Sequence, residues 1–151
     1  MSNKKVLYID MDNVLVDFQS GIDQLDEATR VKYKNDLDEV PGIFSLMKPK
    51  EGAIEAFNEL SEVFDTYILS TAPWKNPTAW SDKLRWVHEH LGESAYKRLI
   101  ITHHKDLNAG DFLVDDRDKN GAKEFLGEWI KFDPEQKEEW SRIKAYLLGK
   151  Q

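Results

Sequence analysis

The chain contains no cysteine in its 151 residues. This absence excludes disulfide bonds, zinc sites built on thiolates, and thiol nucleophiles. Any nucleophile or metal ligand in this protein must therefore offer an oxygen or a nitrogen atom.

Positive charge is scarce as well. The sequence has 21 lysine and arginine residues against 28 aspartate and glutamate residues, so its formal net charge is -7. A surface that binds a nucleic-acid backbone needs a basic stripe, and no nucleic-acid polymer is expected as a partner. A small anion is compatible with this charge, because one cation in a crevice outweighs distant surface charges at short range.

Long hydrophobic runs are also missing. No apolar stretch is long enough to cross a bilayer, and the residues before Val6 are too few for the apolar region of a signal peptide. We therefore expect no membrane contact and a cytoplasmic location. The length and the 40% of hydrophobic residues fit one domain with a small insertion.

Apolar segments that are typical of buried strands alternate with segments of helical periodicity. The alternation predicts an α/β fold, a Rossmann-like parallel sheet with helices on both faces and right-handed crossovers. Strands are expected at residues 5–10, 65–71, 99–101, 111–116 and 129–132, and helices at 53–64, at 80–91 with an apolar stripe of Trp80, Leu84, Val87 and Leu91, and from Pro134 onward.

Residues 17–44 differ from this pattern. They are rich in charge, their first hydrophobic residues recur at helical spacing, and the turn signal Pro41-Gly42 closes them. We expect a small helical cap here, inserted after the first strand into a core domain of residues 1–16 and 45–151.

Polar side chains follow three of the expected strands. In a parallel sheet the carboxyl ends of the strands share one edge, so residues distant in sequence meet there. Lys105 lies in the loop after another strand, at the same edge. The residues expected to converge with it are Asp10, Asp12, Ser70, Thr71, Asp115 and Asp116.

Clustered carboxylates repel one another, and a hard divalent cation relieves the repulsion. Magnesium fits best, because it accepts few carboxylates, keeps several waters and takes further ligands from a substrate phosphate. Lys105 would supply positive charge to phosphoryl oxygens, and Thr71 a hydroxyl. Phosphoryl transfer depends mostly on positioning and charge stabilisation, for which these groups suffice.

Two acids separated by one residue are a weak signal in a chain with 28 acids, since such pairs also occur in turns and helix caps. The preceding strand and the second acid pair favour a functional role. A calcium-binding EF-hand loop is excluded, because Val14 stands where the third oxygen ligand is needed.

The order of these groups resembles the haloacid-dehalogenase superfamily of phosphatases, and in particular the 5'(3')-deoxyribonucleotidases. The segments that carry the resemblance are 10–18 (DMDNVLVDF), 41–44 (PGIF), 83–87 (KLRWV), 90–92 (HLG) and 112–116 (FLVDD). The similarity runs to about Gly121, and the last thirty or so residues carry none.

The resemblance implies that Asp10 is a nucleophile that forms an aspartyl-phosphate. Asp12 would protonate the leaving alcohol and then activate the hydrolytic water. Magnesium would be held by Asp10, the backbone carbonyl of Asp12 and Asp116, with Asp115 as a supporting partner.

The remaining implied roles concern the substrate, which the resemblance implies is a phosphate monoester, a nucleoside monophosphate. Thr71, Lys83 and Lys105 would bind the phosphate, and Phe18 and Phe44 would line the base pocket. Trp74, in the loop beside Thr71, is expected at the rim of that pocket.

Two departures from the family leave the substrate open. Ala72 stands where a serine usually contacts phosphate, and the cap is much shorter than in the animal enzymes. One alternative is a phosphatase for another small phosphorylated metabolite. The other is a receiver-type regulatory domain, which also combines acids, a hydroxyl and a lysine but in a different order along the chain.

Overall fold

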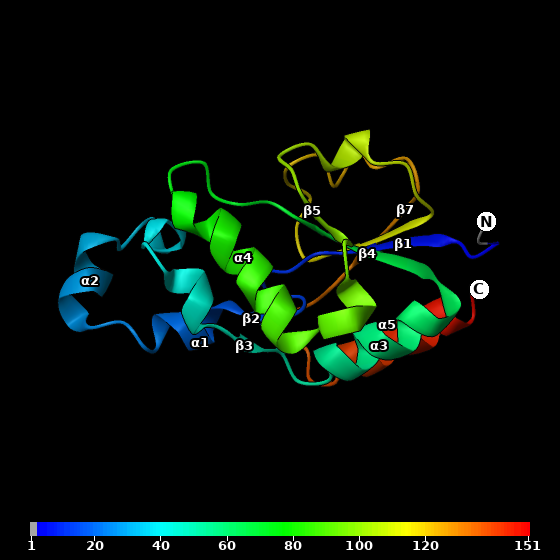
Figure 1. Cartoon of the computed structure of the whole chain (residues 1–151), viewed down its shortest axis with the longest axis horizontal. Coiled ribbons are helices and arrows are strands. Elements are labelled where there is room, and N and C mark those ends of the chain that lie inside the picture. The colour runs from blue at the N-terminus through cyan, green and yellow to red at the C-terminus, as the bar shows by residue number, and fades with distance from the viewer. Residues whose placement is uncertain (1–2) are drawn as a thin grey trace.

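The computed structural model describes residues 3–151, and its centre is a sheet of five parallel strands (Figure 1). The sheet order is β5-β4-β1-β6-β7. The strands lie within one or two residues of their expected positions: β1 Val6–Ile9, β4 Asp65–Ser70, β5 Leu99–Ile101, β6 Phe112–Asp115 and β7 Glu128–Lys131.

In order along the chain, these strands occupy the sheet positions 3-2-1-4-5. Receiver domains have the order 2-1-3-4-5, so this topology is not that of a receiver. The strand order thus argues against the regulatory alternative independently of any catalytic residue.

Successive side chains of a strand point to opposite faces of the sheet, and the core divides accordingly. Leu7 and Ile9 of β1 belong to a large hydrophobic cluster to which α3 (Ala53–Val63), α4 (Pro77–His90) and α5 (Glu139–Leu148) also contribute. Tyr8 belongs to a smaller cluster on the opposite face, covered by Ala122 and Phe125 of the segment after β6. Both faces are therefore covered, as the apolar strands predicted. The expectation of helices on both faces is wrong in part, because α3, α4 and α5 contribute to the first cluster only and the second face is covered by this irregular segment.

The expected apolar stripe of α4 is partly wrong. Trp80 and Leu84 are 39% and 44% exposed. The helix instead turns Ala79, Lys83 and Trp86 toward the interior, where Lys83 donates hydrogen bonds to Asp12 and Ser70. A buried lysine interrupts the hydrophobic pattern on which the prediction relied.

The last helix, α5, begins at Glu139, five residues later than Pro134 suggested. Pro134 lies in the turn before it. Trp140 is buried as expected, and its indole N–H donates to the carbonyl of Val14 at 2.7 Å. This hydrogen bond ties α5 to the loop that follows β1.

The segment expected as a cap lies at one end of the molecule, where Figure 1 shows α1 and α2 apart from the sheet. It contains α1 (Phe18–Ile22), α2 (Glu27–Lys32) and the 3-10 turns η1 (Leu37–Glu39) and η2 (Ile43–Leu46). Its ends are joined by an antiparallel ladder that the sequence did not suggest, between β2 (Val16–Asp17) and β3 (Lys48–Pro49). The ladder holds the entry and exit of the segment side by side.

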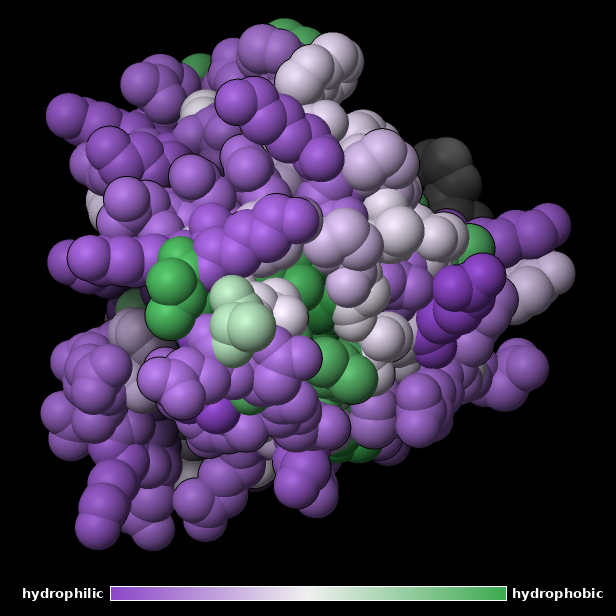
Figure 2. All heavy atoms as spheres, turned by 90° about the vertical axis from the view of Figure 1, so that its left-hand side faces the viewer, coloured by the Kyte–Doolittle hydropathy of each residue, from purple (hydrophilic) through white to green (hydrophobic). Residues whose placement is uncertain are grey.

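The surface of this end is predominantly hydrophilic, and its hydrophobic residues form a small central group (Figure 2). Within residues 3–151, no helix has the length and apolar character needed to cross a membrane.

Candidate active site

The loop after β1 turns sharply around the carbonyl of Met11. That oxygen accepts the backbone N–H groups of Val14, Leu15 and Val16 at 3.1, 2.9 and 2.9 Å. The Met11 side chain is buried in the core, and the side chains on either side of it, Asp10 and Asp12, line one narrow hollow of about 20 Å³. The two acids share one crevice, as the sequence predicted.

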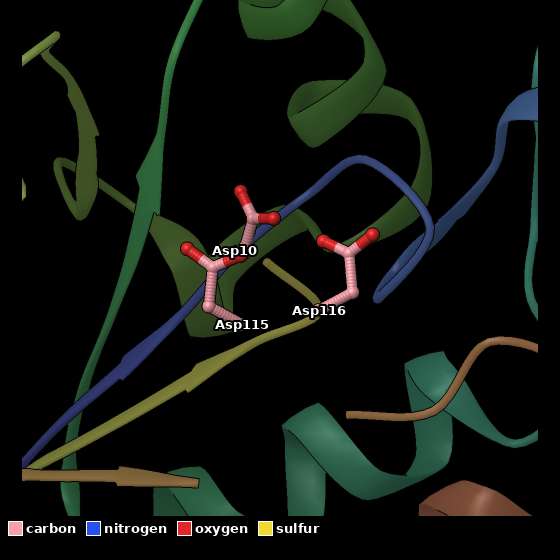
Figure 3. Close-up of side chains that lie close together, drawn as sticks. All are labelled: Asp10, Asp115 and Asp116. Atoms are coloured by element: carbon pink, nitrogen blue, oxygen red, sulfur yellow. The ribbon is translucent and has the colours of Figure 1, made fainter. Parts of the chain in front are cut away.

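Three carboxylates meet beside this hollow (Figure 3). Asp10, Asp115 and Asp116 each offer one oxygen, and these oxygens lie within 4.8 Å of one another. Asp10 extends from β1, while Asp115 ends the adjacent strand β6 and Asp116 follows it. Parallel pairing of neighbouring strands therefore produces the acid cluster that the sequence predicted.

Lys105 supplies the cation of this cluster. Its Nζ donates to Asp10 Oδ1 at 3.1 Å and to Asp115 Oδ2 at 2.5 Å, and its side chain is 4% exposed. Burial alone would lower the pKa of Lys105, but attraction by the two carboxylates raises it above its ordinary value. With all groups ionised, three carboxylates and one ammonium leave two negative charges, which suits a divalent cation.

The backbone of Lys105 is held by the turn that follows the acid pair. Its N–H donates to the carbonyl of Asn120 at 2.7 Å. The next residue, Gly121, has φ +85°, and a Cβ there would lie 2.8 Å from the backbone nitrogen of Asp106. Only glycine permits both this backbone conformation and this close approach.

The acid pair is poised to hold protons in the absence of a metal ion. Burial, followed by the charge of Asp10, raises the pKa of Asp115 to about 8 and that of Asp116 to about 6. The Lys105 ammonium opposes the shift at Asp115 without cancelling it. Lys105 alone therefore does not neutralise the three carboxylates.

Asp12 has a separate cation. Lys83 is fully buried on α4, and its Nζ donates to Asp12 Oδ1 at 3.0 Å and to Ser70 Oγ at 2.8 Å. Burial raises the pKa of Asp12, the Lys83 charge opposes this, and Asp10 adds to it, so that the pKa lies above its usual value. Lys83 is absent from the wall of the narrow hollow and contacts Asp12 instead.

Of the other expected phosphate ligands, Thr71 lines the narrow hollow. Its hydroxyl donates to the carbonyl of Thr102 at 2.7 Å, so it must rotate before it can donate to a phosphate oxygen. Ala72 is fully buried.

The three aromatic residues expected in the substrate pocket do not line one common pocket. Phe18 lines a second hollow of about 380 Å³ beside Asp12. Phe44 is 2% exposed, and the Lys83 ammonium lies 4.5 Å from the centre of its ring. Trp74 is 81% exposed, packs against His103 with ring centres 5.7 Å apart, and lines neither hollow.

Several residues around the two hollows were missed at the sequence level. Arg117, Lys119 and Asn120 line the narrow one, and their position just after the acid pair at the carboxyl edge could have revealed them. Five others line the larger hollow, and nothing in their spacing pointed to it: Asn13, Lys34, Asn35, Leu37 and Asp38.

Residues 23–143 match the family model described as "5' nucleotidase, deoxy (Pyrimidine), cytosolic type C protein". The chain belongs to this family of 5'(3')-deoxyribonucleotidases. It is a 5'(3')-deoxyribonucleotidase-like hydrolase, as the sequence motifs indicated. The matched region continues beyond Gly121 to residue 143, so the expectation that the last thirty residues carry no family similarity is wrong.

Individual relatives agree. The chain is 56% identical to a protein of Vibrio phage KVP40 named "Putative 5'(3')-deoxyribonucleotidase", over 98% of this chain and 87% of that one. It is 28% identical to the human protein "5'(3')-deoxyribonucleotidase, cytosolic type", over 85% of this chain and 79% of that one.

Solved structures agree on the fold. A haloacid-dehalogenase-like hydrolase from Xanthomonas campestris superposes with a TM-score of 0.57 at 9% identity, covering 98% of this chain and 99% of that one. A haloacid-dehalogenase-like hydrolase from Streptococcus pneumoniae gives a TM-score of 0.56 at 11% identity, covering 97% and 100%. At such low identity these structures support the architecture of the core.

Proposed function

We propose that this protein is a magnesium-dependent phosphomonoesterase that hydrolyses deoxynucleoside monophosphates through an aspartyl-phosphate on Asp10. The observation that carries the proposal is the way in which the charged side chains beside the narrow hollow are paired. Asp10 lies in a cluster with Lys105 and two further acids, while Asp12 is held apart by Lys83. The family of the chain supports a nucleoside monophosphate as substrate.

The reaction uses these residues in two steps. A carboxylate oxygen of Asp10 attacks phosphorus, the bond to the ester oxygen breaks, and Asp12 gives that oxygen its proton. Water then attacks the aspartyl-phosphate, Asp12 takes a proton from it, and phosphate leaves as the Asp10 carboxylate re-forms. The raised pKa of Asp12 suits it to carry the proton in both directions.

Magnesium fits the donor set, because the cluster offers hard carboxylate oxygens whose charge Lys105 alone does not neutralise. Asp10, the Asp12 carbonyl and Asp116 would hold it, and it would stabilise negative charge on the phosphoryl oxygens. Asp115 is better placed to support them, since its two oxygens already accept from Lys105 and from the backbone N–H of Arg117.

Magnesium affinity is expected to rise about tenfold or more between pH 6 and pH 8, with release of protons on binding. The pKa of Asp115 is raised to about 8 and that of Asp116 to about 6, so protons compete with the metal below these values. Calorimetric titrations in two buffers of different ionisation enthalpy measure the magnesium affinity and the number of protons released on binding. Equal affinity at the two pH values, without proton release, would contradict the assignment.

The direct test of the proposed function is phosphate release from a panel of nucleoside and sugar monophosphates, with magnesium and with a chelator. We expect turnover of deoxynucleoside monophosphates that stops when the metal is removed. Turnover that is unchanged by the chelator would exclude the metal-dependent mechanism.

A second candidate is a phosphatase for another small phosphorylated metabolite. It is favoured by the polar wall of the larger hollow, where Phe18 is the one aromatic residue. The same panel separates the candidates, because in this case a sugar phosphate is turned over faster than any nucleotide. Under either candidate the cytoplasm stays the proposed location.

A further inference from the structure

Asn76 stands at the N-cap of α4, directly before the first helical residue, Pro77. Asparagine is favoured at an N-cap because its side-chain oxygen usually accepts a backbone N–H of the first helical turn. Within residues 3–151, the Asn76 side chain accepts no such N–H. The residue is 1% exposed, so its amide needs other hydrogen-bond partners.

Those partners lie in the cap. The Asn76 amide nitrogen donates to the carbonyls of Asp38 and Val40 at 2.9 and 3.0 Å. Its side-chain oxygen accepts from the hydroxyl of Thr78 at 2.6 Å, and that hydroxyl oxygen accepts the backbone N–H of Gly42 at 2.9 Å. Asn76 and Thr78 thus form a latch that joins the start of α4 to the cap.

Further hydrogen bonds hold the cap where it begins and ends. The β2–β3 ladder joins its two ends, and the indole N–H of Trp86 on α4 donates to the carbonyl of Met47 at 3.0 Å. Between these ties the cap extends away from the sheet to α2 (Figure 1), which has no buried residue among those that the structure describes. The latch therefore holds the part of the cap that lies between α2 and η2.

The helix that carries the latch also holds Asp12. Lys83, about two turns further along α4, donates to Asp12 and to Ser70 from a fully buried position. The ring of Phe44, at the end of the cap, lies 4.5 Å from the Lys83 ammonium. One helix therefore contacts both the cap and the loop that bears the acids, and it fixes their separation.

We propose that Asn76 is a positioning residue, whose hydrogen bonds to the cap hold it at a fixed distance from Asp12 before any substrate binds. The inference rests on the proposed function for the role of Asp12. Asn76 lines neither of the two hollows, so it acts through the cap. If the latch is released, the cap is in place in only a fraction of the molecules, and the apparent substrate affinity falls by that fraction.

Asn76→Asp tests the hydrogen bonds separately from the packing. Aspartate has nearly the same shape and caps a helix as well as asparagine does, but it places an oxygen against the carbonyls of Asp38 and Val40. We expect amide hydrogen exchange in residues 27–46 to become about tenfold faster or more, because repulsion replaces two hydrogen bonds. Exchange in β1 and β6 should stay within about twofold. Mass spectrometry of peptic fragments measures both regions.

Steady-state assays with thymidine 5'-monophosphate and magnesium supply a second readout. In Asn76→Asp we expect KM to rise several-fold while kcat stays within about twofold. Bound substrate restores the position of the cap, and Lys83 still holds Asp12. A purely structural role would lower the melting temperature without separating KM from kcat.

Ser81→Ala is the matched control on α4, because the exposed Ser81 hydroxyl donates to the carbonyl of Thr78 in its own helix. It should change neither exchange nor KM. Thr78→Val removes the bridge to Gly42 and keeps the shape of the side chain. It should act like Asn76→Asp with a smaller effect, and it takes the place of that variant if Asn76→Asp does not fold.

Three results would overturn the inference. The first is native exchange in the cap of Asn76→Asp, the second an equal acceleration in the cap and in the sheet, and the third an unchanged KM beside faster exchange in the cap. A chain that hydrolyses nucleotides but shows one of these results overturns the inference alone. A chain that hydrolyses no monoester, yet exchanges faster only in the cap of Asn76→Asp, keeps the latch and overturns the catalytic proposal.

Discussion

Asp10→Asn is expected to lower phosphate release about a thousandfold or more, because an amide cannot replace the carboxylate as nucleophile. The substitution preserves the size of the side chain, which is 8% exposed. Single-turnover and steady-state assays of phosphate release with magnesium measure the loss. Release equal to that of the native chain would remove Asp10 from the nucleophilic role.

Asp10→Asn should not lower the stability of the fold. The Asp10 charge raises the pKa values of both Asp115 and Asp116, so removing it relieves repulsion in the metal-free protein. We expect an unchanged or higher melting temperature, as for other active-site groups whose placement opposes stability. Asp118→Asn, an exposed change in the same segment, should affect neither activity nor melting temperature.

Lys105→Met is expected to lower the free energy of unfolding by about 3–5 kcal/mol, the usual loss when a buried ion pair loses one partner. Methionine fills a similar volume but leaves Asp10 and Asp115 without a cation in a site where both are almost fully buried. For a chain of this length the melting temperature should fall by about 10 °C. Denaturant unfolding and calorimetry measure the two quantities.

The loss of unfolding free energy in Lys105→Met should depend on pH. Carboxylates whose folded pKa is raised contribute stability that is present at low pH and is lost as pH rises through that pKa. Asp115 and Asp116, with pKa values of about 8 and 6 even beside Lys105, should therefore make Lys105→Met less destabilising at pH 5 than at pH 8. Lys123→Met, at an exposed lysine, is the control. A loss of equal size at both pH values would contradict the electrostatic origin.

Much of the central sheet, and of the acid cluster at its edge, could be predicted from the sequence, because the sequence patterns that indicate them are local. Apolar runs ending in acid identified β1 and β6, and the parallel sheet implied by alternating strands and helices required their ends to meet. Asp10, Asp115 and Asp116 follow from this rule alone, and so does the approach of Lys105 to them. Backbone pairing decides these positions, and it needs little knowledge of side-chain packing.

The sequence by itself thus determined which strands carry acids, which loop carries the lysine, and which family the motifs resemble. Tertiary structure alone decided how α4 is rotated, since the ion pair with Asp12 turns Lys83 inward and leaves Trp80 exposed. It also buried Phe44 and placed Lys34 and Arg117 at the same larger hollow. These placements depend on contacts between distant segments, whose energies periodicity and spacing do not encode.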